Sequence, residues 1–312
     1  MHNEPFLILS AVGAILALAS VAAGFLRSFA SQSATIGVIE NLNTRIKAWW
    51  WIVGILGGAI LAGHAAVIGV FVAISFLALR EFLTLTAVQA ADHRTVIASF
   101  LVALPVQYVL IGIGRYDVFT AFLPAIALLI VPVLTALSGD IKNYLAKTAE
   151  LGWGLMICIY CVSHVPALLM LHIPGYENRQ ILLVMFVVLV SQASDVLQYV
   201  WGKLLGRRKI APKVSPSKTV EGLIGGIASA TMLGASMWRI TPFNVGQAGA
   251  IAFLIAVTGF LGGLIMSAIK RDRGVKEWSH VVPGHGGILD RLDSICFSAP
   301  IFFHLTRIVF AS

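Results

Sequence analysis

The residues best suited to chemistry lie in one polar stretch near the C-terminus, between Ser267 and Asp293. Asp290 and Asp293 are three residues apart at the start of an expected helix, so their carboxylates share one face. Hard cations such as Mg²⁺ prefer oxygen ligands, usually one or two carboxylates together with substrate phosphates. Glu277 adds a carboxylate across the intervening loop, and the stretch therefore predicts a divalent-cation site.

The same stretch contains groups that bind phosphate. His285, Gly286 and Gly287 come directly before the expected helix, where small residues let backbone N–H groups approach an anion. Positive charge comes from four side chains nearby, Lys270, Arg271, Lys276 and Arg291. A basic loop followed by ordinary acids at a helix start is the alternative. It does not explain why glycines, a histidine, two spaced aspartates and several cations coincide.

A second basic stretch, residues 201–219, contains lysines and arginines but no acid. Ser215, Lys218 and Thr219 lie at its end, where an apolar run begins, and hydroxyls, a lysine and helix-start N–H groups together suit a triphosphate. The alternative is charge that sets the topology or attracts anionic lipid. That explanation fits three other cations of this stretch equally well, Arg207, Arg208 and Lys209.

Asp195 stands inside an apolar run, VVLVSQASDVLQYV. An ionisable side chain in a membrane span is costly, and it usually pairs with another group or faces a polar cavity. This position predicts a further metal ligand. The alternative is simple contact with water or a neighbouring lysine at the end of the span.

The composition limits the class of protein. Of 312 residues, 58% are apolar and 12% are charged, and the mean hydropathy is +0.91. Soluble domains are about 45–50% apolar and about 25% charged. A soluble enzyme, a disordered chain and a secreted disulfide scaffold are therefore excluded, and the three cysteines lie in apolar surroundings.

Long apolar windows predict about ten transmembrane helices, because a helix satisfies its own backbone hydrogen bonds in lipid. The windows lie near residues 6–26, 49–63, 65–80, 98–114, 117–137, 150–172, 179–200, 220–240, 247–268 and 289–310. We therefore expect an all-α, polytopic membrane protein. It would form a single membrane domain over residues 1–312, with an N-terminal helical bundle over 1–190 and a C-terminal catalytic region over 191–312.

The cations predict the orientation. Most of the 22 lysines and arginines fall in alternate loops, which places those loops in the cytoplasm and both chain ends outside. The first apolar run is preceded by Met1 to Glu4 without a positive charge, so it is expected to be a retained span rather than a signal peptide.

Two motifs resemble the phosphatidate cytidylyltransferase family, also called CDP-diacylglycerol synthases. One is Ser-x-x-Lys-Arg from Ser267, followed by Lys-acid and by His-Gly-Gly-x-x-Asp-Arg-x-Asp ending at Asp293. The other is Asp-x-x-x-Tyr from Asp195, followed by Ser-Pro-x-Lys-Thr-x-Glu-Gly from Ser215. The resemblance covers roughly residues 190–295.

This resemblance implies transfer of CMP from CTP to phosphatidic acid, giving CDP-diacylglycerol and pyrophosphate. The expected setting is a homodimer in a bacterial inner membrane, with membrane lipids around it, the site on the cytoplasmic side and no nucleic-acid partner. Mg²⁺ is the expected cofactor, with room for a second cation. The expected catalytic residues are Asp290, Asp293, Lys270, Lys276 and Arg291. The expected substrate contacts are Ser215, Lys218, Thr219, Arg271, His285, Gly286 and Gly287. The expected metal ligands are Asp290, Asp293, Glu277 and Asp195.

Three positions depart from the family pattern. Glu277 replaces the usual aspartate, Ser217 stands where a second lysine is common, and Gln198 stands where a small residue is usual. These departures are compatible with a divergent bacterial paralogue and leave a different lipid phosphate open as the acceptor. A transporter that uses Asp195 is the alternative from another class, but the internal repeat typical of transporters is not evident.

Overall fold

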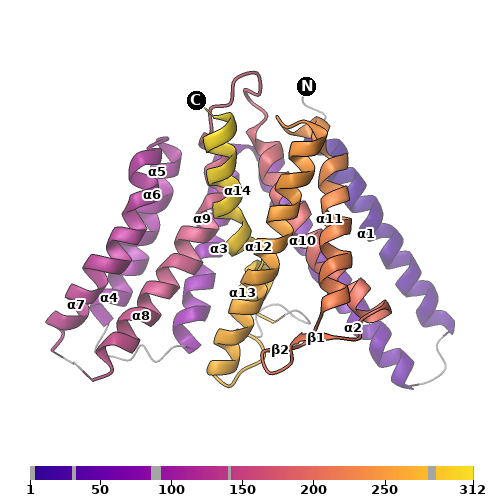
Figure 1. Ribbon diagram of the computed structural model, residues 1–312, viewed down its shortest axis with the longest axis horizontal. Coiled ribbons are helices and arrows are strands. Elements are labelled where there is room, and N and C mark those ends of the chain that lie inside the picture. Colours follow the sequence, from indigo (N-terminus) through magenta and orange to yellow (C-terminus); the bar gives the residue numbers. More distant parts are fainter. Residues whose placement is uncertain (1–3, 30–32, 86–92, 140–141, 280–285, 312) are drawn as a thin grey trace.

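The computed structural model describes residues 4–29, 33–85, 93–139, 142–279 and 286–311, which are almost entirely helical (Figure 1). Nine α-helices are described before residue 170, several of them joined by short π-helical or 3₁₀ turns. Their bounds are α1 Glu4–Phe29, α2 Ser33–Ala62, α3 His64–Leu85, α4 His93–Ala98, α5 Leu104–Gly112, α6 Tyr116–Ala125, α7 Val131–Leu137, α8 Tyr144–Leu155 and α9 Val162–Ala167.

The C-terminal part contains five more described helices and one small hairpin. The helices are α10 Gln180–Leu204, α11 Val220–Ser236, α12 Val245–Asp272, α13 Leu289–Leu292 and α14 Ile295–Phe310. Strands β1 (Lys209–Ala211) and β2 (Ser215–Thr219) pair antiparallel between α10 and α11. The sequence did not predict this hairpin. Its physical reason is the pair of prolines at 212 and 216, which cannot donate backbone hydrogen bonds and interrupt any helix there.

The apolar windows correspond to helices. In the described part of the chain six helices are long and apolar enough to cross a membrane, by length and composition. They are Glu4–Phe25, His64–Leu85, Tyr116–Leu137, Tyr144–Met170, Gln180–Leu204 and Val245–Asp272. Four shorter apolar helices, Trp49–Ala62, Val96–Gly112, Val220–Ser236 and Ile295–Phe310, match the remaining windows. The prediction of an all-α polytopic membrane protein is confirmed.

One boundary differs from the prediction. Helix α2 begins at Ser33, whereas the region before residue 49 was expected to be a polar loop. Polar residues do not end a helix by themselves, and this stretch has no proline to interrupt the hydrogen bonds. The helix therefore continues through the basic region into the apolar one.

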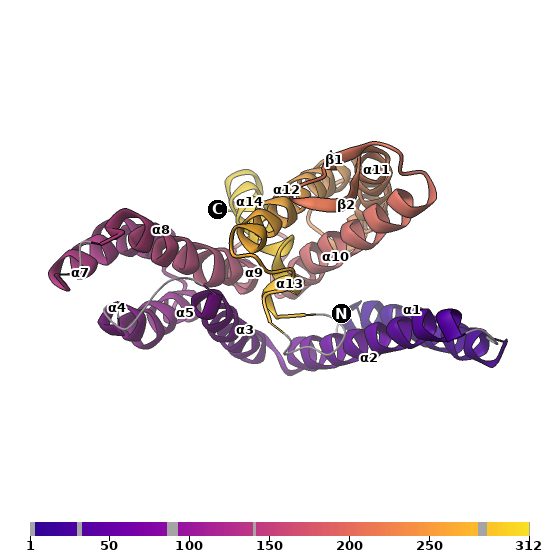
Figure 2. The same cartoon turned by 90° about the horizontal axis from the view of Figure 1, so that it is seen from below.

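The helices form two layers. Seen from below, α1, α2 and α3 follow one another along one layer, and α10, α11 and α12 form the other, with α13 between them (Figure 2). Close packing between α10 and α11 depends on small residues: a Cβ on Gly226 would lie 2.2 Å from the Cγ of Gln198. Gln198, one of the departures from the family pattern, therefore lies in the contact between α10 and α11. Its side chain also donates a hydrogen bond to Ser194 (2.8 Å) within α10.

Candidate functional site

Several predicted polar residues lie on elements that come together toward the end of the bundle that carries the β-hairpin, where α12 ends (Figure 1). Asp195 comes from α10, Lys218 from β2, Lys270 from the last turn of α12, and Asp290 and Asp293 from the segment around α13. Electrostatic interactions connect Asp293 to Lys218, Lys270 and Asp195. The structure thus brings together charged groups from four elements that are far apart in the sequence.

Asp290 holds the loop before it in place. Its Oδ1 accepts a hydrogen bond from Lys270 Nζ at 2.6 Å, and both side chains are nearly buried. Its Oδ2 accepts the N–H groups of Trp278 and Gly287, each at 2.9 Å. Gly286 has φ +77°, and a Cβ there would lie 2.6 Å from the same oxygen, so only glycine fits this turn.

These contacts bear on one expectation. Gly287 was predicted as a substrate contact, and in this structure its N–H donates to Asp290, so the substrate contact itself stays a prediction. The physical reason is that the protein supplies its own anion at this turn, a carboxylate close in the sequence. His285 lies outside the described residues.

Asp195 and Asp293 form a partly buried acidic pair. Ser294 joins them, because its Oγ donates to Asp195 Oδ1 (2.8 Å) and its N–H donates to Asp293 Oδ1 (2.9 Å). Burial raises the pKa of Asp293, while Lys270, Lys218 and Arg291 counteract that rise. Two carboxylates that are withdrawn from water side by side require compensating positive charge.

Lys218 provides part of that charge. Its Nζ lies 3.3 Å from the carbonyl oxygen of Phe260 and 4.6 Å from the centre of the Phe260 ring. Burial lowers the pKa of Lys218, and the two carboxylates of the acidic pair oppose this. Gly263 leaves the necessary room, since a Cβ there would lie 2.8 Å from Lys218 Nζ and 3.6 Å from Asp293 Oδ2.

The acidic pair fits a hard cation better than the predicted ligand set does. Within the described ranges, no three His, Cys, Asp or Glu side chains are grouped as ligands of one ion. Asp290 is already bound by Lys270 and two amides, and the Glu277 side chain is exposed. Asp195 and Asp293 offer partly buried carboxylate oxygens, and substrate phosphates commonly complete the coordination of Mg²⁺. The metal assignment itself stays a prediction.

The remaining predicted residues have structural or peripheral positions. Thr219 is the N-cap of α11, and its Oγ1 accepts the N–H of Gly222 at 3.1 Å. Ser215 is buried at the other end of β2. Arg271 donates to the carbonyl oxygens of Val214 (3.3 Å) and Val275 (2.8 Å), which connects the hairpin to the end of α12.

Two other predicted cations lie on different sides of the site. The Lys276 side chain is exposed. Arg291 is partly buried, and its carbonyl oxygen accepts a hydrogen bond from Gln192 Nε2 on α10 (3.2 Å). Arg291 also interacts electrostatically with both members of the acidic pair.

Sequence reasoning missed one residue, Glu81 of α3. Its Oε1 accepts hydrogen bonds from Ser279 Oγ (2.7 Å) and the N–H of Ile288 (2.9 Å), and its Oε2 accepts the N–H of Leu289 (3.0 Å). The neighbouring Phe82 stacks on Trp278, with ring centres 5.4 Å apart. The available signal was an acid near the end of an apolar run. The high cost of an ionisable side chain in a membrane span singled out Asp195 and applies equally to Glu81. We call Glu81 with its three partners, Ser279, Ile288 and Leu289, the Glu81 cluster.

Gly287→Ala is expected to destabilise the protein by about 1–3 kcal/mol, the usual cost of overpacking. A Cβ at this position would lie 2.5 Å from Glu81 Oε2, whose carboxylate is held by the Glu81 cluster and cannot move without losing those bonds. Thermal unfolding in detergent measures the loss. Gly69→Ala on α3 is the matched control, because nothing lies within 4 Å of its added Cβ. An unchanged midpoint of thermal unfolding for both variants would contradict the close contact between residue 287 and Glu81.

Comparison with known proteins identifies the family of this chain. The model of the cytidylyltransferase family matches residues 43–309. The Escherichia coli K12 protein YnbB, described as uncharacterized, is 40% identical over 270 residues, which cover 86% of this chain and 88% of YnbB.

Two matched relatives are named phosphatidate cytidylyltransferase. The one from Staphylococcus saprophyticus is 38% identical over 130 residues, or 40% of this chain and 50% of the relative. The one from Staphylococcus aureus strain COL is 32% identical over 174 residues, or 54% of this chain and 66% of the relative. The chain therefore spans between half and two thirds of the length of these two relatives. With the family model matching from residue 43 to residue 309, the chain belongs to the cytidylyltransferase family, whose members are nucleotidyltransferases.

Proposed function

We propose that this protein is a phosphatidate cytidylyltransferase, which transfers CMP from CTP to phosphatidic acid and releases pyrophosphate. The observation that carries the proposal is the partly buried acidic pair, Asp195 and Asp293, with Lys218, Lys270 and Arg291 around it at one end of a membrane bundle. The names of the Staphylococcus relatives support the same reaction.

The charges suit the reaction. An oxygen of the lipid phosphate attacks the α-phosphorus of CTP, and the bond from that phosphorus to the oxygen bridging to the β-phosphorus breaks as pyrophosphate leaves. Both reactants are anions, so the site must position them and supply positive charge that is already in place. Lys218, Lys270 and Arg291 do this, and Asp290 orients Lys270 through their 2.6 Å contact. The attacking phosphate is already ionised, so no general base is required.

Asp195 and Asp293 are the residues that would hold Mg²⁺. When bound there, the ion would neutralise charge that develops on the phosphates during transfer. A second cation stays a prediction.

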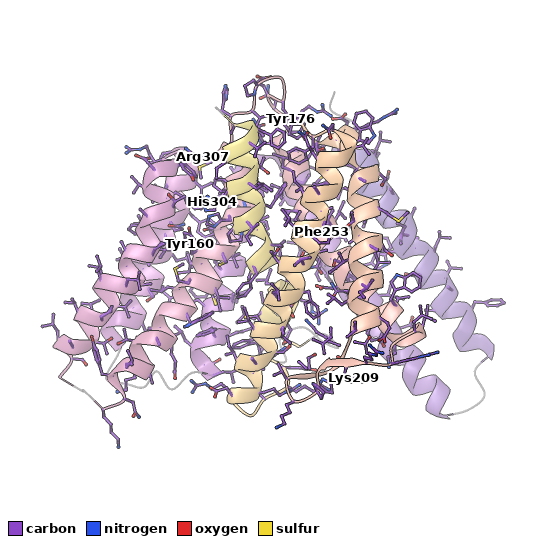
Figure 3. All side chains as sticks on the ribbon, in the orientation of Figure 1. Tyr160, Tyr176, Lys209, Phe253, His304 and Arg307 are labelled. Carbon is purple, nitrogen blue, oxygen red and sulfur yellow. The ribbon has the colours of Figure 1, made fainter. Side chains whose placement is uncertain are left out.

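The expected location is the cytoplasmic side of a bacterial inner membrane. Lysines and arginines are frequent in cytoplasmic loops near membrane spans. The hairpin cation Lys209 lies at the lower edge of the molecule, at the end with the site, whereas Tyr176 and Arg307 lie toward the opposite end (Figure 3). The homodimer implied by the family resemblance also stays a prediction.

The direct test is an assay of pyrophosphate release by the purified full chain with Mg²⁺, CTP and a panel of lipid phosphates. We expect release that requires phosphatidic acid and falls by about 100-fold or more when EDTA removes the metal, with recovery on adding Mg²⁺ back. A clear preference for an isoprenoid phosphate would show that this lipid phosphate, and not phosphatidic acid, is the acceptor. Absence of turnover with every lipid phosphate, together with CTP-independent flux in proteoliposomes, would overturn the proposal in favour of a transporter.

A further inference from the structure

An apolar groove of about 330 Å³ lies between the two layers, next to the site. It is enclosed by α2, α3, α10 and the segment 288–295. Its lining includes Leu56, Ile74, Leu77, Val188 and Ile295. Its volume is in the range of small-molecule sites, about 300–1,000 Å³.

The groove begins at the site and leads away from it into the bundle. Ile288 and Arg291 line one end, and the Glu81 cluster fixes Ile288 against the last turns of α3. Along α3 the lining runs from Leu77 back to Val70, which is about 10 Å at 1.5 Å per residue. Because α3 is an apolar span over His64–Leu85, this part of the lining lies across the middle of the span.

The charges around the groove select an anionic head group. Among its described lining residues Arg291 carries the one charge, and Gln192 from α10 is a polar neighbour. Arg291 also interacts with both members of the acidic pair, so it lies between the apolar lining and the reacting groups. We call this space the Arg291 groove.

A groove on the other side of the site has the opposite character. It measures about 400 Å³ and lies between α8 and α12, where Trp153 and Ala268 contribute to its lining. Its charged residues are Glu150, Asp272 and Arg273, and Arg273 forms ion pairs with the two acids. Two carboxylates and one cation give the lining of this groove a net negative charge, which disfavours a phosphate, whereas the described lining of the Arg291 groove contains no acid.

We infer that the Arg291 groove holds an acyl chain of the lipid phosphate acceptor while Arg291 binds its phosphate. This inference rests on the proposed function and names the place of the lipid at that site. A chain that leaves the bilayer only exchanges one apolar environment for another, so little binding energy comes from its hydrophobicity. The groove therefore discriminates by the length and shape of the chain, and the charge on Arg291 provides the attraction.

Photochemical labelling tests the place of the chain without requiring turnover. Phosphatidic acid that carries a diazirine in the middle of its acyl chain is added to the full-length protein in detergent. The mixture is irradiated, and the labelled peptides are mapped by mass spectrometry. We expect labels on α2 and α3 around Leu56 and Ile74, and competition by unlabelled phosphatidic acid but not by phosphatidylcholine. Labels on the groove between α8 and α12, or labels spread evenly over all exposed apolar faces, would overturn the inference.

Two matched substitutions, in which an alanine is replaced by tryptophan, test the same point. Ala73→Trp fills the Arg291 groove, and Ala268→Trp fills the opposite one; both alanines are exposed helix residues. Ala73→Trp is expected to abolish the labels on α2 and to raise KM for long-chain phosphatidic acid about tenfold, with KM for CTP unchanged. A dihexanoyl acceptor should be affected less than a dioleoyl one.

The two proposals fail in different ways. If wild-type protein releases pyrophosphate but Ala73→Trp keeps the wild-type labels and chain-length preference, the groove assignment is wrong and the cytidylyltransferase stands. If wild-type protein labels as expected but turns over no lipid phosphate, the groove assignment stands as a lipid site and the reaction is wrong. An effect from Ala268→Trp in place of Ala73→Trp would contradict the charge argument.

Discussion

Replacing Asp293 with asparagine is expected to lower CMP transfer by about 10³-fold, the scale of losing one preorganised electrostatic group. The amide oxygen can still accept the N–H of Ser294, which Asp293 Oδ1 accepts at 2.9 Å, so the local fold is retained. What disappears is one charge of the acidic pair, and with it the second carboxylate ligand proposed for Mg²⁺.

Two measurements separate loss of the metal site from loss of the fold. Wild-type protein at saturating Mg²⁺ should gain stability, by about 2.7 kcal/mol at an ion concentration of 100 times its Kd, and Asp293→Asn should not. Asp272→Asn is the matched control, because its side chain is 74% exposed at the end of α12. Asp293→Asn with near-normal turnover and an intact Mg²⁺ response would contradict the assignment of the acidic pair.

Glu81→Ala is expected to destabilise the protein by about 1–3 kcal/mol or more, because one buried N–H group loses its acceptor at that cost and a second, partly buried one loses its acceptor as well. Those groups belong to Ile288 and Leu289, directly before Asp290. Displacement of this segment should also reduce CMP transfer by about 100-fold, as misplacement of reacting groups by about 1 Å can. Glu81 is a positioning residue in this account and contacts no reacting atom.

The test of Glu81 combines unfolding in detergent with the pyrophosphate assay. Glu81→Gln keeps one carbonyl oxygen as acceptor and should recover part of both losses. Glu177→Ala is the control, since that carboxylate is exposed and accepts a hydrogen bond from the nearby N–H of Gly175 (3.0 Å), away from the Glu81 cluster in the sequence. Wild-type stability and turnover for Glu81→Ala would show that the Glu81 cluster does not position the site.

The N-terminal half therefore takes part in the site. The division of the chain at about residue 190 stays a prediction, but Glu81 and Phe82 lie on one side of that boundary and contact Leu289 and Trp278 on the other. The Arg291 groove crosses the same boundary, because α2 and α3 form one wall and α10 with the segment 288–295 forms the rest.

The sequence by itself determined the class of protein and most of the chemically important residues. Apolar windows predict helices because hydropathy is a local property and every backbone group in lipid must be satisfied within its own helix. Asp195 was found because charge inside a span is too costly to occur without a partner, whereas Lys218, Lys270 and Asp293 were found from short local motifs that combine carboxylates, cations, hydroxyls and glycines.

Only the tertiary structure decided which of these groups are partners. Asp195 contacts Ser294, which lies 99 residues away in the sequence, and Glu81 contacts Ile288, which lies 207 residues away. These contacts form because glycines such as Gly263 and Gly287 leave room where side chains from other helices enter. The spacing of Asp290 and Asp293 predicted one shared ligand set, yet Asp290 binds Lys270 and two amides while Asp293 joins Asp195. Hydropathy sets the depth of a residue in the membrane, but helix rotation and close packing set its neighbours, and these depend on contacts between distant segments.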